Sequence, residues 1–165
     1  MKAVQVNNGV ISVDNVSEPS GNGIIVDVCS VGICGSDLHL IDAGMMSVMP
    51  GHEIAGVTRD GTQVAIEPIL SCGECKHCAE GEEPYCRESL PNTFGIGING
   101  GMAERIVVPE RFLIPLDTRV PVEDAFLVEP LAVAVRSLGR AGVTKGDRVC
   151  VIGAGTIGLC CVAVA

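Results

Sequence analysis

The stretch CGECKHCAEGEEPYC, residues 72–86, places four cysteines at the spacing C-x2-C-x2-C-x7-C. Four thiolates this close repel one another unless a soft cation lies between them, and zinc in a tetrahedron of four sulfurs is the usual solution. The sequence therefore predicts a zinc lobe held by Cys72, Cys75, Cys78 and Cys86. Because a four-sulfur site has no open position, this metal is expected to hold a loop and not to perform chemistry.

Two other interpretations of this run are weaker. A bacterial ferredoxin run has its fourth cysteine three residues after the third and a proline after it, whereas here seven residues separate Cys78 from Cys86. Disulfides need an oxidising compartment, and no signal peptide opens the chain. His77, inside the run, is expected to be a bystander because four thiolates already fill the tetrahedron.

Composition restricts the class of protein. The chain has 165 residues, 47% of them hydrophobic, but only 2% aromatic, so the core must be built from aliphatic side chains. The net charge of −9, with no basic stripe, argues against nucleic acid and anionic membrane as partners. Residues 149–165 carry no charge but fall short of the about 20 residues that a membrane-spanning helix needs. A cytoplasmic protein is expected.

The part of the chain up to about Asp117 is predicted to be mostly β. Alternating apolar and polar residues around Asn7-Asn8-Gly9 predict a hairpin over residues 1–16. Short apolar runs bounded by turn residues predict further strands at residues 24–29, 54–57, 63–66 and 103–108. Many short strands with turns between them indicate a β-barrel-like or sandwich domain. Cys29, in one of these strands, is expected to be a small core residue.

Helical character is predicted from about Val122, interrupted at Pro130 and resumed from Leu131 to about Arg140. A strand is expected over residues 148–152, with Cys150 in the core. The hexapeptide that follows, Gly153-Ala154-Gly155-Thr156-Ile157-Gly158, has the G-x-G-x-x-G pattern. After a strand and before a helix, such glycines allow a tight turn and close approach of a pyrophosphate.

Three short motifs carry groups that can perform chemistry: residues 32–39 with Cys34, residues 51–53 with His52, and residues 128–131 with Glu129. Each is weak alone, because a lone cysteine or histidine is more often a core residue than a ligand. Glu129 also has an ordinary explanation, since an acid at a helix start complements the helix dipole.

In their order along the chain, these motifs, the cysteine run and the glycine turn resemble the zinc-dependent medium-chain dehydrogenases, and most closely the sorbitol and polyol dehydrogenase branch. The resemblance implies a GroES-like, partly open β-barrel with a structural zinc lobe, followed by the first β-α element of a truncated Rossmann domain. It implies domains at residues 1–145, including linking helices from about 122, and 146–165.

The resemblance also implies a second, catalytic zinc. Cys34 and His52 are its implied ligands, and Glu129 is implied as a third, held directly or through water. Glu53 adjoins this metal and is expected to join it transiently. Two zinc ions per chain are therefore expected, with zinc as the Lewis acid that stabilises an alkoxide.

The remaining roles follow from the same resemblance. Asp37 is expected to fix the imidazole of His52. Ser36 is expected to take the substrate hydroxyl proton and His39 to pass it to solvent. Gly153, Gly155 and Gly158 are the implied contacts for NAD or NADP.

The resemblance implies an oxidoreductase that transfers hydride between a secondary alcohol or polyol and a nicotinamide cofactor, in a homodimer or homotetramer. The chain is about half as long as members of this family and is expected to be a fragment. The alternative is a catalytically silent zinc-binding module without a complete cofactor site. An acid after a second nucleotide-domain strand would favour the enzyme with NAD.

Overall fold

The chain folds as two units, Met1–Phe126 and Leu127–Ala165, and each is described by itself. The structure is a computed structural model that describes all residues, 1–165. The boundary between these units, after Phe126, comes earlier in the chain than the predicted domain boundary at residue 145. The helix after Leu127 belongs to the second unit. The boundary between functional domains stays a prediction.

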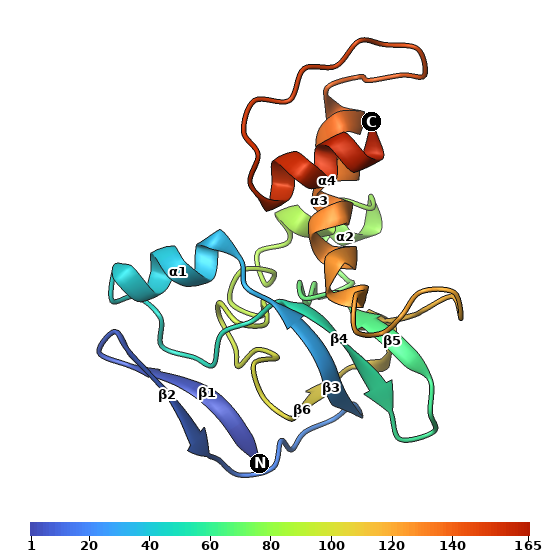
Figure 1. Cartoon of the computed structure of the whole chain (residues 1–165). Coiled ribbons are helices and arrows are strands. Elements are labelled where there is room, and N and C mark those ends of the chain that lie inside the picture. The colour runs from blue at the N-terminus through green and yellow to red at the C-terminus, as the bar shows by residue number, and fades with distance from the viewer. The chain divides into compact units, whose positions relative to one another are not determined.

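The first unit begins with the predicted hairpin. Strands β1 (Lys2–Asn7) and β2 (Val10–Asn15) pair antiparallel and lie side by side in dark blue in Figure 1. Asn8 and Gly9 between them both have positive φ, at 51° and 77°, which is the geometry of a two-residue turn matched to the twist of a hairpin. The hairpin prediction is confirmed, and Asn-Gly is the sequence signal that carries it.

The main sheet of this unit has five antiparallel strands in the order β6-β3-β4-β5-β7. Their bounds are Ile24–Gly32 for β3, Glu53–Thr58 for β4, Gln63–Ile66 for β5, Arg105–Val108 for β6 and Leu113–Pro115 for β7. The sheet curls into a half-barrel, whose strands β3, β4 and β5 are seen in Figure 1. The predicted mostly β, partly open barrel is confirmed.

A mainly aliphatic core packs within the first unit. Its buried members are Val26, Ile54, Val64, Ile66, Phe94, Ile106, Val108 and Phe112. Two of the three phenylalanines in the chain are therefore used in this one cluster. Cys29 is exposed, contrary to prediction, because it lies at the irregularity of β3 between Val28 and Ser30, where strand alternation is broken.

Short helical segments connect the strands. Helix α1 (Gly35–Asp42) follows β3, and α2 (Lys76–Ala79) lies in the cysteine lobe. Single 3-10 turns occur at η1 (Glu83–Tyr85), η2 (Glu110–Phe112) and η3 (Ala125–Leu127). With these connections, the functional motifs lie at strand ends and helix starts.

The second unit contains α3 (Val128–Arg140) and α4 (Thr156–Val164). The predicted break at Pro130 is wrong: Pro130 is the third residue of α3, where its missing N–H would have no partner within the helix anyway. The predicted strand at residues 148–152 is also wrong, and Cys150 is exposed. A strand needs a neighbour for its hydrogen bonds, and no segment of residues 1–165 pairs with these residues.

None of the helices combines the length and the apolar character needed to cross a membrane.

One ion pair fastens the chain after the hairpin to β6, and it gives a pH-dependent prediction. The guanidinium of Arg105 donates to both carboxylate oxygens of Glu18, at 2.7 and 2.8 Å. These bonds lower the pKa of Glu18 from 4.5 to about 2. A carboxyl with a depressed pKa contributes stability that is present above pH 4.5 and is lost as the pH falls towards 2.

We therefore expect Glu18→Gln to lower the melting temperature modestly at pH 6, since exposed pairs contribute little. The difference between the two proteins should narrow below pH 4.5 and vanish near pH 2. Thermal melts of both proteins across this pH range measure the difference in melting temperature. Any destabilisation of the cysteine lobe by acid is common to both proteins and cancels in this difference. A difference that does not change with pH would contradict the assignment.

Candidate functional site

The pairing of β3 with β4 brings three predicted functional groups together. Gly32, the last residue of β3, is opposite Glu53, the first residue of β4. Cys34 follows β3 at the N-terminus of α1, and His52 precedes Glu53. The ligand atoms of Cys34, His52 and Glu53 all lie within 4.8 Å of one another. His52 and Glu53 are only 6% and 3% exposed, and Cys34 is half-buried.

Gly32 provides the space that the Glu53 carboxylate occupies. A Cβ built on Gly32 would lie 2.9 Å from Cδ and 3.0 Å from Cβ of Glu53, and closer still to one carboxylate oxygen. The carboxylate end of Glu53 could swing aside, but its Cβ is fixed to the backbone of a buried residue and cannot. Glycine at position 32 thus keeps the carboxylate beside Cys34 and His52.

The carboxylate of Asp37 contacts the backbone and the imidazole that carry the cluster. Its Oδ2 accepts the Cys34 backbone N–H at 3.0 Å, and its Oδ1 accepts the Gly51 N–H at 3.4 Å. The same Oδ1 lies 3.5 Å from Nδ1 of His52. That distance is at the limit for a hydrogen bond, and this buried nitrogen has no formed bond to any other group. The contact is therefore an electrostatic pairing that turns Nδ1 towards Asp37.

The charges of the cluster favour a cation. Burial opposes the charged form of His52, but the Asp37 and Cys34 side chains outweigh it and raise the pKa of the imidazole to about 9. Burial also opposes charge on Asp37, but His52 and the Cys34 N–H outweigh it and lower its pKa. Burial raises the pKa of Glu53. A buried pocket that stabilises positive charge next to a thiol, an imidazole and a carboxyl suits a divalent metal.

The predicted proton-relay residues lie on α1. Ser36 is half-buried, and its Oγ lies 3.5 Å from Nε2 of His52. His39 is three residues further along the helix and is exposed. Positions three apart lie on the same face of a helix, so the imidazole of His39 is placed one turn from the hydroxyl and in water.

The Gly32 contact gives a second prediction. We expect Gly32→Ala to displace the Glu53 carboxylate and to weaken zinc binding at this cluster about 10- to 100-fold, as changes that misplace a ligand do. A competition titration with a chromophoric chelator measures it. Gly35→Ala is the matched control, because a Cβ at Gly35 would meet no atom within 4 Å. Equal zinc affinity of the Gly32 and Gly35 variants would contradict the role given to Gly32.

The four cysteines of the lobe form a second cluster. Sulfur–sulfur distances are 3.5 Å for Cys75–Cys78, 3.5 Å for Cys86–Cys72 and 3.8 Å for Cys72–Cys78. Sulfurs around a tetrahedral zinc with bonds of about 2.3 Å lie about 3.8 Å apart. Backbone N–H groups of Glu74 and Cys75 point at the Cys72 sulfur, each at 3.4 Å, as expected for a sulfur that carries negative charge.

The lobe sulfurs differ in acidity. The backbone N–H of Cys72 lowers the pKa of Cys86 to about 6, whereas burial and the neighbouring sulfurs raise the pKa of Cys78 to about 11. One sulfur of the group therefore ionises readily while a neighbour resists, which is the behaviour of closely packed thiols.

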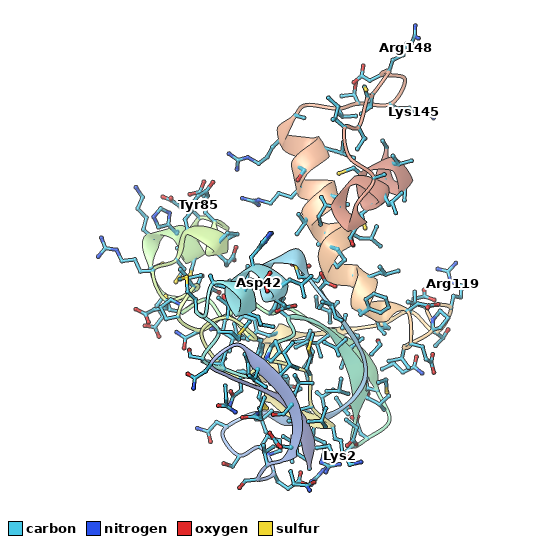
Figure 2. All side chains as sticks on the ribbon, turned by 60° about the vertical axis from the view of Figure 1, so that its left-hand side comes forward. Lys2, Asp42, Tyr85, Arg119, Lys145 and Arg148 are labelled. Atoms are coloured by element: carbon cyan, nitrogen blue, oxygen red, sulfur yellow. The ribbon has the colours of Figure 1, made fainter.

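Other lobe residues lie outside the sulfur cluster. His77 pairs with Glu82, Nδ1 to Oε2 at 3.3 Å, and is not among the clustered ligand atoms. Tyr85, in η1, is half exposed, with its ring 6.0 Å from that of His77, and Figure 2 shows it at the outer surface of the lobe. Arg111 fastens the lobe to the barrel: its guanidinium donates to the carbonyl of Ser71.

The remaining predicted residues lie in the second unit. Glu129 is in the first turn of α3, so its part in a zinc site stays a prediction. Gly155 caps the N-terminus of α4, and Gly153 has a φ of 109°. A Cβ at Gly158 would lie 2.9 Å from the Gly153 carbonyl carbon, so the turn closes only with glycine there. Pyrophosphate binding at this turn stays a prediction.

Gly32 and Gly51 lie in the motifs singled out from the sequence, but their contributions were not predicted: Gly32 makes room for Glu53, and the Gly51 N–H donates to Asp37. Only the strand register could have revealed Gly32, because the pairing of residues 32 and 53 places them opposite each other.

Known proteins resemble the chain throughout. It is 35% identical to D-xylulose reductase A of Aspergillus oryzae over 159 residues, which cover 86% of this chain and 44% of that protein. Galactitol-1-phosphate dehydrogenase of Escherichia coli superposes on 99% of this chain with a TM-score of 0.91, at 31% identity and over 52% of its own length. An alcohol dehydrogenase of Escherichia coli CFT073 complexed with NADH superposes with a TM-score of 0.89 at 31% identity. The match covers 99% of this chain and 52% of the length of that protein.

The chain thus spans about half the length of the relatives it matches. The predicted resemblance to zinc-dependent polyol dehydrogenases is confirmed. Residues 20–118 match the alcohol dehydrogenase GroES-like domain. With the half-barrel, the cysteine lobe and this match in agreement, the chain belongs to the alcohol dehydrogenase GroES-like domain family.

Proposed function

We propose that the whole protein is a zinc-dependent dehydrogenase that transfers hydride between a secondary alcohol or polyol and NAD or NADP. The observation that carries the proposal is the cluster of Cys34, His52 and Glu53 with Asp37 behind it. Relatives named D-xylulose reductase and galactitol-1-phosphate dehydrogenase act on polyols or their ketoses, which supports the substrate class.

Cys34, His52 and Glu53 would hold the catalytic zinc. A thiolate, an imidazole and a carboxylate form a donor set that zinc accepts, and their ligand atoms are close enough to share one ion. Nδ1 of His52 faces Asp37, which leaves Nε2 for the metal. Glu53, expected from the sequence to join the metal transiently, is proposed here as a ligand of the resting site, and Glu129 remains a predicted ligand. The cysteine lobe would hold a second, structural zinc.

When bound, the catalytic zinc supplies Lewis acidity that favours the alkoxide form of the alcohol. Ser36 is placed beside Nε2 of His52, where its hydroxyl can accept the proton of the substrate while it gives up its own proton towards His39. His39, exposed one turn along α1, passes that proton to water. The glycine turn before α4 would hold the pyrophosphate of the cofactor, which would supply a nicotinamide as the hydride acceptor.

The same proposal covers partners and place of action. The substrate is a small alcohol or polyol, and the protein acts in the cytoplasm as a homodimer or homotetramer. Nucleic acid and membrane lipid are not partners, because the net charge is −9 and no basic stripe is present.

The test is a dehydrogenase assay on the protein in its full natural length. Xylitol, sorbitol, galactitol 1-phosphate and simple secondary alcohols are offered with NAD and with NADP, and absorbance of the reduced nicotinamide is followed. We expect turnover of at least one polyol, lost in Cys34→Ser. Zinc binding at both clusters with no turnover of any alcohol would favour the alternative, a silent zinc-binding module.

A further inference from the structure

The segment that leads into His52 lies under a glycine-rich loop, residues 95–102. Three successive N–H groups of this loop donate to the three carbonyls that precede His52: Gly100 to Met49 at 2.7 Å, Gly101 to Gly51 at 2.9 Å, and Met102 to Pro50 at 3.1 Å. The side chain of Asn99 adds a fourth bond, since its Oδ1 accepts the Met49 N–H at 3.1 Å. Two stretches of chain about fifty residues apart are thus joined backbone to backbone.

The loop and the segment touch without intervening side chains. A Cβ on Gly100 would lie 2.6 Å from the Pro50 carbonyl oxygen and 2.7 Å from Cα of Gly95. A Cβ on Gly95 would lie 2.7 Å from the Gly51 nitrogen. These neighbours are backbone atoms of buried residues, which cannot rotate away as a flexible side chain does. Any side chain at Gly100 must therefore move Pro50 and Gly51.

A shift of Gly51 reaches the cluster by two short routes. Gly51 is bonded directly to His52 in the chain. Its N–H also donates to Oδ1 of Asp37 at 3.4 Å, the oxygen that lies 3.5 Å from Nδ1 of His52. Because Asp37 orients the imidazole, movement of Gly51 changes both the position and the rotation of the ring.

We propose that Gly100 and Asn99 are positioning residues for His52, acting through the backbone of residues 49–51. The inference rests on the proposed metal site, and it adds that the ligand geometry there depends on a loop that contributes no ligand. Neither residue is close to the cluster in sequence. The close backbone approach at Gly100 and the Asn99 bond to Met49 are what assign the role.

The first experiment compares Gly100→Ala with Gly97→Ala. Both positions lie in the same loop and both are crowded by backbone, but a Cβ on Gly97 would meet Pro91 and Leu90, with the Leu90 oxygen at 2.7 Å. Zinc affinity is measured by competition with a chromophoric chelator. The zinc ion that the unsubstituted chain binds and Cys34→Ser does not is assigned to the cluster of Cys34, His52 and Glu53. We expect Gly100→Ala to weaken binding of that ion about 10- to 100-fold. Gly97→Ala should lower the melting temperature but keep the affinity.

Asn99→Ala and Asn99→Asp keep the inference testable if Gly100→Ala does not fold. Asn99→Ala removes the acceptor for the Met49 N–H and should weaken binding of the same zinc ion. Asn99→Asp retains a side-chain oxygen and should restore the affinity. A purely structural role of Asn99 would lower stability in both variants without this difference in zinc binding.

Hydrogen exchange of the Gly51 amide, followed by NMR, gives a readout that does not depend on metal. We expect faster exchange of this amide in Gly100→Ala than in Gly97→Ala. Equal exchange, together with equal zinc affinity, would overturn the positioning role. If Cys34→Ser holds as much zinc as the unsubstituted chain, the proposed metal site is wrong. The exchange rate of the Gly51 amide then tests by itself whether the loop positions residues 49–51.

Discussion

Cys75→Ser is expected to unfold the cysteine lobe while the barrel remains folded. Structural zinc contributes folding free energy directly, on the order of 10 kcal/mol where a small module depends on it. The lobe has little else to hold it, since its cysteines are at most half-buried apart from Cys86 and its helices α2 and η1 are one turn each. The barrel has its own aliphatic core and should keep its strands.

Trypsin offers a local measurement of this change. Lys76 and Arg87 lie within and directly after the cysteine run, so both should be cut rapidly in Cys75→Ser and slowly in the unsubstituted protein. Zinc content should fall by one equivalent per chain. Cys29→Ser is the control, because Cys29 is an exposed cysteine outside both clusters. Slow cleavage in Cys75→Ser would show that the lobe does not depend on its sulfurs.

The second large effect is expected for His52→Ala in the protein at its full natural length. Loss of a ligand at the catalytic cluster removes several kcal/mol of transition-state stabilisation, which corresponds to a fall in kcat of about 10³-fold or more. The fold should be retained, because the aliphatic core of the barrel does not include His52. Initial rates with the best polyol substrate and a thermal melt measure the two quantities.

His77→Ala is the matched control for that variant. His77 lies on the surface of the lobe and pairs with Glu82, so its removal should leave kcat unchanged. If His52→Ala kept the kcat of the unsubstituted protein, the assignment of the catalytic cluster would be wrong. A fall in kcat for both variants would instead indicate a general effect of losing histidines.

The strands of the first unit were predictable because their signals are local. Asn8-Gly9 determines the hairpin turn, and short apolar runs bounded by turn residues mark β3, β4 and β5. The errors fall where structure depends on partners far along the chain. Residues 148–152 have the composition of a buried strand but no neighbouring strand to pair with, and the outward turn of Cys29 results from an irregularity in pairing with β4.

The candidate site was predictable in its residue types but not in its arrangement. The resemblance to a known family, carried by residue types in their order along the chain, identified Cys34 and His52 as candidate ligands. The placement of Glu53 opposite Gly32 follows from the register of β3 with β4, and the contacts of Gly51 and Gly100 follow from the packing of loops. Sequence spacing records neither the register nor these contacts, because both arise only when distant segments pack.

The placement of the one tyrosine has a spectroscopic consequence. The chain contains no tryptophan, and Tyr85 is in η1, within the cysteine lobe. Ultraviolet emission from the protein therefore originates almost entirely from the lobe, and the barrel is nearly silent. A change in emission on chelation or oxidation reports on the lobe alone, while far-ultraviolet circular dichroism follows the barrel strands. The native chain thus carries its own fluorophore for separating the loss of one metal from the unfolding of the rest.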